Sequence, residues 1–99
     1  MEDEKLYRII VMGHVQGVGF RAMTRHFARK SSIRGSVRNR PDGNVEIMVC
    51  GPEDDMRLME RFCRSSPGLS RVEDVAHELV EDPALKQKYK KMSEFEIAY

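Results

Sequence analysis

The sequence is poor in cysteine and has no long uncharged run. Cys50 and Cys63 are the only cysteines, whereas a small secreted domain usually carries several that pair evenly. Both fall within periodic apolar segments, which predicts buried free thiols and not a redox or metal site. The longest stretch without a charged residue, 9–20, is too short and too rich in Gly, His and Gln to cross a bilayer. We therefore expect neither a disulfide-stabilised scaffold nor a membrane protein.

The first residues do not predict a signal peptide. Residues 1–5 are mostly acidic and lack the apolar core that such a segment needs. With no targeting segment visible, we expect a cytoplasmic protein. Its 99 residues are enough for a single domain with its own core, spanning 1–99, and too few for two.

Acidic residues are absent from Lys5 to Arg40, a stretch that holds nine Lys and Arg residues. From Asp42 to Tyr99 the balance reverses, with eight basic residues against thirteen acidic ones. A strongly positive half-chain favours anionic ligands or nucleic acid. The simpler interpretation is a set of solvated cations, and individually we apply it to Arg25, Arg29, Lys30 and Arg34.

Several catalytic arrangements are missing as well. The chain has no Asp-x-Asp pair for an aspartyl-phosphate route and no Walker-type Gly-Lys-Ser/Thr. His14, His26 and His77 lie on different predicted elements without metal-ligand spacing, and only His14 is a candidate for testing. A Cys-based phosphatase needs a cysteine in an anion-binding loop, and neither cysteine meets that need. Gly17-x-Gly19-x-x-Ala22 matches a dinucleotide fingerprint literally, but the chain has no room for a doubly wound domain.

What the sequence does contain is a glycine-rich stretch, residues 13–21, between an apolar run and a helical pattern. Its three glycines let the backbone bend and leave N–H groups uncovered. Such groups at a helix N-terminus form an electropositive nest for an anion. Arg21 would sit in the first helical turn, against the helix dipole. A bound phosphate would compensate, because its oxygens match the forked donors of a guanidinium. The stretch therefore predicts a phosphate cradle.

Strand and helix patterns alternate along the chain. Period-two alternation predicts strands at 6–12, 33–38, 45–50, 72–80 and 95–99. Helical spacing of apolar residues predicts one helix from Phe20 to about Ser31 and a second between Gly51 and Pro67. Arg40-Pro41-Asp42-Gly43 predicts a tight turn that makes a hairpin of the second and third strands. The polar, Lys-rich segment 81–92 is predicted to be a loop.

This element order predicts an α+β fold of the ferredoxin-like, split βαβ type. We expect the order β-α-β-β-α-β with a short fifth strand, and two helices on one face of an antiparallel sheet. The apolar faces of the two helices and the inward-facing strand residues would together form a single core.

One polar residue stands out in that pattern. Asn39 continues the inward register of Ile33, Gly35 and Val37, just before the predicted turn. An amide in that register either caps the turn or acts in a site, and the spacing leaves both open.

An RNA-binding module of the same topology is the main rival hypothesis. Such a module presents stacking aromatic residues on its central strands. The strand at 45–50 carries none, and the first strand has only Tyr7. A basic half without aromatics therefore makes nucleic acid an unlikely partner, although a non-catalytic anion- or RNA-binding module stays as the alternative.

Two motifs resemble the signatures of the acylphosphatase family. Val11-x-Gly13-x-Val15-Gln16-Gly17-Val18-x-Phe20-Arg21 is similar to the first. Gly35-Ser36-Val37-Arg38-Asn39, followed by Gly43-x-Val45 and Gly51, is similar to the second. Ser36 departs from the pattern, since the family usually has an aromatic residue there. The element order and the Phe95-Glu96-Ile97-x-Tyr99 ending fit too, so the resemblance covers nearly the whole chain.

The resemblance implies an enzyme that hydrolyses acyl phosphates to a carboxylate and inorganic phosphate. It implies that Arg21 binds the phosphoryl group and that Asn39 positions the attacking water. The backbone N–H groups of the loop would complete the phosphate site, which consists of Val15, Gln16, Gly17, Val18, Gly19 and Phe20.

The implied chemistry agrees with the missing catalytic arrangements. A carboxylate is a good leaving group, and a loose phosphoryl-transfer transition state needs mainly positioning and stabilised oxygens. Fixed N–H dipoles and a guanidinium supply both, so we expect no metal and no cofactor. The expected partners are an acyl phosphate and inorganic phosphate, bound to a monomer. A further alternative is an accessory domain that acts on carbamoyl phosphate within a larger maturation protein. The short chain and its complete-looking ending make us expect a stand-alone enzyme instead.

Overall fold

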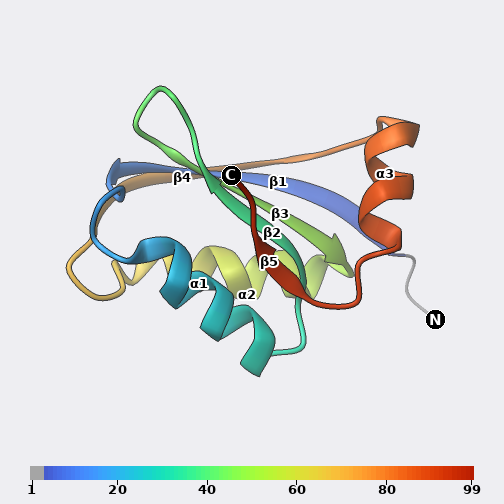
Figure 1. Ribbon diagram of the computed structural model, residues 1–99, viewed down its shortest axis with the longest axis horizontal. Helices are drawn as coiled ribbons and strands as arrows, with labels where there is room; N and C mark the ends of the chain where they lie inside the picture. The colour runs from blue at the N-terminus through green and yellow to red at the C-terminus, as the bar shows by residue number, and fades with distance from the viewer. Residues whose placement is uncertain (1–3) are drawn as a thin grey trace.

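The computed structural model describes residues 4–99 as one five-stranded sheet with three helices (Figure 1). The strand order across the sheet is β4-β1-β3-β2-β5. The elements in chain order are β1 (Lys5–His14), α1 (Phe20–Lys30), β2 (Arg34–Asn39), β3 (Val45–Gly51), α2 (Glu53–Arg64), β4 (Arg71–Leu79), α3 (Pro83–Lys90) and β5 (Phe95–Ile97). The predicted ferredoxin-like α+β fold is therefore confirmed. Most of the acidic segment 1–5 lies outside the described residues.

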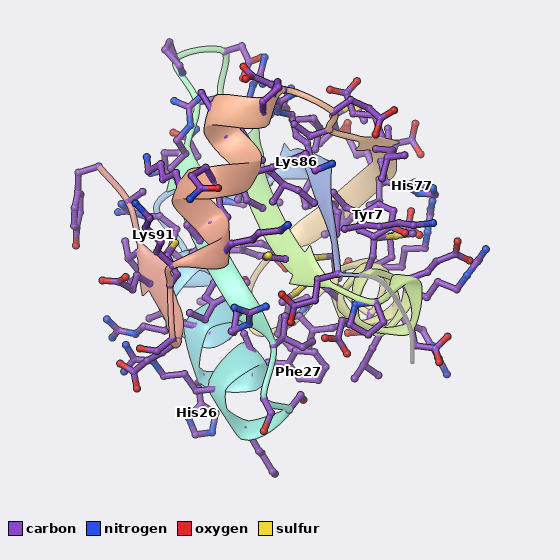
Figure 2. The ribbon with its side chains drawn as sticks, turned by 90° about the vertical axis from the view of Figure 1, so that its right-hand side faces the viewer. Tyr7, His26, Phe27, His77, Lys86 and Lys91 are labelled. Carbon is purple, nitrogen blue, oxygen red and sulfur yellow. The ribbon has the colours of Figure 1, made fainter. Side chains whose placement is uncertain are left out.

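The main core lies between the sheet and the helices α1 and α2, which cover the same face of it (Figure 1). Every second residue of β1 and β3 points into this core, as the period-two pattern predicts. Phe27 of α1 stacks on Phe62 of α2, with ring centroids 4.2 Å apart, and Figure 2 shows Phe27 directed toward α2.

Both cysteines are buried. Cys63 lies fully buried in the main core, and burial raises the pKa of its thiol to about 12. Cys50 is also buried and free, so the prediction of buried free thiols is confirmed.

The prediction of a loop at 81–92 is wrong, because this segment contains the helix α3. Asp82 caps the helix by accepting a hydrogen bond from the backbone N–H of Ala84 (2.9 Å), and Pro83 occupies the first helical position. Leu85 and Tyr89, four residues apart, share the face that meets the sheet. The many lysines of the segment concealed this short apolar stripe.

The third helix also corrects the expectation of a single core with helices on one face. α3 covers one end of the face opposite α1 and α2 (Figure 1). Beneath it lies a second apolar cluster, separate from the main core, which includes Leu6, Met48 and Cys50. β3 is buried on both faces for this reason, so Met48 is only 3% exposed although its strand was predicted to alternate between buried and exposed positions.

The sheet is mixed, not antiparallel as predicted. β5 pairs in parallel with β2, with Gly35 opposite Phe95 and Val37 opposite Ile97. The helix α3 explains the direction of β5, because it crosses the second face and delivers the chain to the far edge at the end where β2 begins (Figure 1).

The edge strand β4 is more exposed than its pattern predicted. Val75 points into the core, but His77 and Leu79 of the same predicted face are exposed. His77 lies at the surface with its Nδ1 3.0 Å from the carboxylate of Glu60 on α2.

Within residues 4–99 no helix is long and apolar enough to cross a membrane.

The positive half of the chain is largely neutralised once it folds. Five of its basic residues form ion pairs with carboxylates, most of them from the acidic half; they are Arg8, Arg29, Arg34, Arg38 and Arg40. The excess of positive charge in the sequence is thus not an excess on one surface. A basic residue without such a partner is a better candidate for binding an anion.

Ser36 and Tyr89 share a buried hydrogen bond of 2.7 Å that links β2 to α3. We expect Tyr89→Phe to lower the free energy of unfolding by about 1–2 kcal/mol, because the buried Ser36 hydroxyl loses its partner. Adding Ser36→Ala should recover part of that loss, since both polar groups are then absent. Urea unfolding of the two single variants and the double variant measures this, with Tyr99→Phe at a fully exposed ring as the control. Strictly additive losses would contradict the expected coupling.

Candidate active site

The loop 15–19 connects β1 to α1 and alternates anchored with exposed residues. Val15 and Phe20 are each 1% exposed, and Val18 packs against the main core. Gly17 and Gly19 lie exposed between these anchors, with φ angles of 75° and 77°. Such positive φ angles favour glycine, so the glycines let the loop turn while keeping its backbone accessible.

The helix α1 begins directly after this loop with an uncovered N-terminus. Gly19 is its N-cap and provides no side-chain hydrogen bond, and the first turn contains no acidic residue. The first intrahelical bond runs from the N–H of Met23 to the carbonyl oxygen of Gly19 (3.1 Å). The N–H groups of the preceding helical residues have no partner within the helix. This is the arrangement in which a helix N-terminus attracts an anion.

Gln16 ties the loop to the turn between β2 and β3. Its Nε2 donates hydrogen bonds of 2.8 Å to the carbonyl oxygens of both Arg40 and Asn44. The sequence motif includes Gln16 and predicts a role for its backbone only. Nothing in the spacing predicted this side-chain clamp, because its two acceptors are backbone atoms about 25 residues further along.

Asn39 is the last residue of β2 and lies at the end of the sheet where the loop begins. It pairs with Val45 of β3, which in turn pairs with Val11 of β1, a few residues before the loop. The Gln16 clamp ends on the residue that follows Asn39. The fold therefore brings together the two motifs that are separate in the sequence.

The turn after Asn39 does not need its side chain. Asp42 accepts a hydrogen bond from the N–H of Asn44 (3.0 Å), and backbone bonds between Arg40, Gly43 and Asn44 close the turn. The Oδ1 atom of Asn39 is buried and has no hydrogen-bond partner within residues 4–99. The hypothesis that Asn39 caps the turn is thus wrong, and a buried acceptor is left without a donor.

Arg21 differs from the paired arginines of the same half-chain. No carboxylate within the described residues forms an ion pair with it. Its guanidinium carbon lies 5.4 Å from the centroid of the Tyr99 ring, a cation–π distance. In the sequence Tyr99 is only the last alternating residue of the final predicted strand, and nothing there places it beside Arg21. The donors of Arg21 remain available to a ligand.

The other candidates from the sequence do not come together. His14, His26 and His77 lie on β1, α1 and β4, and all three are exposed. In the part of the chain that the structure describes, no group of three or more His, Cys, Asp and Glu side chains could hold a metal ion.

The fold and this site together define a ferredoxin-like α+β domain with an uncovered helix N-terminus, an unpaired arginine and a buried free amide oxygen. The Acylphosphatase family model matches residues 7–97. The chain therefore belongs to the acylphosphatase family and is a hydrolase of that class.

Individual relatives agree with the family model. The chain is 44% identical to the acylphosphatase of Nitrobacter hamburgensis over 73 residues, which cover 74% of each chain. It is 45% identical to that of Chromohalobacter salexigens over 73 residues, 74% of this chain and 81% of the relative. The crystal structure of acylphosphatase from Bacillus subtilis superimposes with a TM-score of 0.80 at 35% identity, covering 95% of this chain and 98% of the other.

The same fold also occurs within a much larger protein. Full-length HypF, solved in a phosphate- and nucleotide-bound form, matches with a TM-score of 0.81 at 29% identity. The match covers 100% of this chain but only 12% of HypF. The chain is thus similar both to small acylphosphatases along most of their length and to one part of a larger protein.

Proposed function

We propose that the chain hydrolyses the carboxyl–phosphate bond of acyl phosphates, giving a carboxylate and inorganic phosphate. Arg21 and the backbone N–H groups of loop 15–19 and Phe20 hold the phosphoryl group, and Asn39 positions the attacking water. The observation that supports this assignment most directly is the buried, unpartnered Oδ1 of Asn39 at the loop end of the sheet. Buried acceptors without a donor are rare in native proteins and call for an explanation.

The proposed roles follow from what each group can do chemically. The amide oxygen of Asn39 accepts a hydrogen bond from a water molecule and so fixes where the water oxygen points. That oxygen bonds to phosphorus as the bond from phosphorus to the acyl oxygen breaks, and the carboxylate leaves with the bonding electrons. Arg21 and the N–H groups stabilise the equatorial oxygens of the loose transition state. The water proton passes to solvent or to the phosphate product.

The proposal extends to the state of the protein. In it the chain acts as one domain, as a cytoplasmic monomer, and without metal or cofactor, because the leaving group needs no protonation and the fixed donors supply the charge stabilisation. The partners are an acyl phosphate substrate and the phosphate product.

Release of phosphate from benzoyl phosphate with a chelator present tests this function. We expect hydrolysis by the native chain and a loss of activity in Arg21→Ala. Release that does not depend on Arg21 would contradict the assignment. Salt-dependent binding of single-stranded RNA without any hydrolysis would instead favour the non-catalytic module, and a requirement for metal after chelation would contradict the metal-independent mechanism.

Gln16→Glu should impair catalysis although Gln16 reacts with nothing in the proposal. A glutamate of the same size cannot donate to the carbonyl oxygens of Arg40 and Asn44, so the loop is released from the turn next to Asn39. We expect kcat/KM to fall on the order of 10- to 100-fold, the effect of a small misplacement of catalytic groups. Gln87→Glu, on the exposed side of α3, makes the same chemical change and is the control. Equal activity of the two variants would show that the Gln16 hydrogen bonds do not support catalysis.

A further inference from the structure

The uncovered part of the second sheet face forms a groove of about 640 Å³ between α3 and the β2–β3 turn. Figure 1 shows these two features at opposite ends of that face, with the sheet between them. Ile10 and Ala76 lie on its floor, Leu85 and Lys88 belong to the α3 wall, and Arg40 stands on the turn side. We call it the open-face groove. Its lining includes neither the loop 15–19 nor Arg21 or Asn39, but it includes Tyr99, whose ring lies beside Arg21, so the groove adjoins the proposed active site without sharing its proposed catalytic groups.

Three arginines of the open-face groove surround one buried carboxylate. Glu46, 8% exposed, lies 3.0 Å from Nε of Arg38, 3.3 Å from Nη1 of Arg40 and 3.6 Å from Nε of Arg8. The hydrogen bond from Arg38 to Glu46 is the main cause that raises the pKa of Arg38, which therefore stays charged. Three guanidinium groups thus share this single carboxylate.

Two further carboxylates balance the other two arginines. Glu78 lines the groove and pairs with Arg8, and Asp42 holds Arg40 through Nε from outside the lining. Lys88, on the α3 wall, forms no ion pair within residues 4–99, and its Nζ lies 5.6 Å from the centroid of the Tyr89 ring. With Asp42 included, the four Arg and Lys side chains of the lining face three carboxylates, and the positive charge left over is that of Lys88.

Each arginine on the turn side has one guanidinium nitrogen that makes no hydrogen bond to a carboxylate. Arg38 uses Nε and Nη2 on Glu46, which leaves its Nη1. Arg40 uses Nε and Nη1 on Asp42 and Glu46, which leaves its Nη2. Because the ion pairs already fix these guanidiniums, a ligand would lose little side-chain entropy in meeting them. Forked guanidinium donors suit carboxylate and phosphate groups.

We propose that the open-face groove binds a small organic anion with a charged group at each end of an apolar body. One anionic end meets Arg38 and Arg40, the other meets Lys88 on the opposite wall, and the body lies on Ile10, Ala76 and Leu85. The groove has the volume of a site for a small metabolite. This inference does not depend on the proposed hydrolysis, because none of these side chains has a role in that reaction.

Double-ended and single-ended anions distinguish the open-face groove from a general attraction for negative charge. We would titrate terephthalate against benzoate, and 4-carboxyphenyl phosphate against phenyl phosphate, following amide shifts by NMR with inorganic phosphate saturating the proposed active site. Each double-ended ligand should bind about tenfold more tightly than its single-ended counterpart and shift residues of β1, β3 and α3. If only the phosphate ester shows this preference, the ligand class narrows to phosphate esters.

Two charge reversals on the same helix provide the matched variants. Lys88→Glu should abolish the preference for double-ended ligands. Lys86→Glu should leave it unchanged, because Lys86 extends from α3 toward β1 (Figure 2) and lines a different depression with Lys5 and Leu79. No preference in the native chain, or an equal loss of the preference in both variants, would overturn the proposal.

Discussion

Arg21→Lys should lower kcat/KM for benzoyl phosphate on the order of 100-fold or more, the typical effect of removing an oriented donor from a charge-stabilising site. The variant keeps the positive charge and a long side chain. What it loses is the planar pair of donors, because an ammonium group meets phosphate oxygens as a point charge. In the structure no carboxylate within residues 4–99 competes for the guanidinium, and a ligand would therefore receive its full donor set.

The inhibition constant of inorganic phosphate tests the same contact in the ground state. We expect phosphate to inhibit Arg21→Lys more weakly than the native chain, since the proposed role of Arg21 begins with binding. Arg25→Lys, one turn further along α1, makes the same exchange away from the loop and serves as the control. If Arg21→Lys kept a native kcat/KM, the proposed phosphate clamp would be wrong.

The sequence predicted the fold wherever a single periodicity dominated a segment. The alternation in β1 and the helical spacing of Phe20, Met23 and Phe27 follow directly from which face must be buried, and both elements are where we expected them. α3 was missed because its helix signals are local. One cap at Asp82, one proline and two apolar residues four apart are easily outweighed by a run of lysines in a composition-based interpretation.

In the site, too, features that depend on neighbouring residues could be predicted, and features that depend on distant segments could not. The anion-binding character of loop 15–19 could be predicted, because glycines before a helix determine it within a few residues. The Gln16 clamp and the Arg21–Tyr99 contact could not, since each depends on chain segments that meet only through the sheet. The charge pattern was misleading for the same reason. Nine cations without an acid in the sequence become mostly paired once the acidic half folds against them.

Asn39→Ala should abolish nearly all turnover, lowering kcat on the order of 100-fold or more, while inorganic phosphate still inhibits as it does in the native chain. The reason is the proposed division of roles, in which Asn39 orients only the water. Catalytic rates and the inhibition constant of phosphate, measured on the same preparation, separate the two roles. Loss of phosphate binding in a folded Asn39 variant would instead assign this residue to the phosphate site.

The same substitution should not destabilise the protein, and this sets a catalytic amide apart from a structural one. A buried amide that holds a turn costs stability when it is removed, whereas the Oδ1 of Asn39 has no partner to lose within residues 4–99. Deleting an unpaired buried acceptor should raise the free energy of unfolding by up to about 1 kcal/mol, or leave it unchanged. Asn44→Ala, in the adjoining turn, is the matched control and should keep native turnover. An Asn39→Ala variant that loses activity and stability together would indicate that Asn39 supports the strand end and not the water.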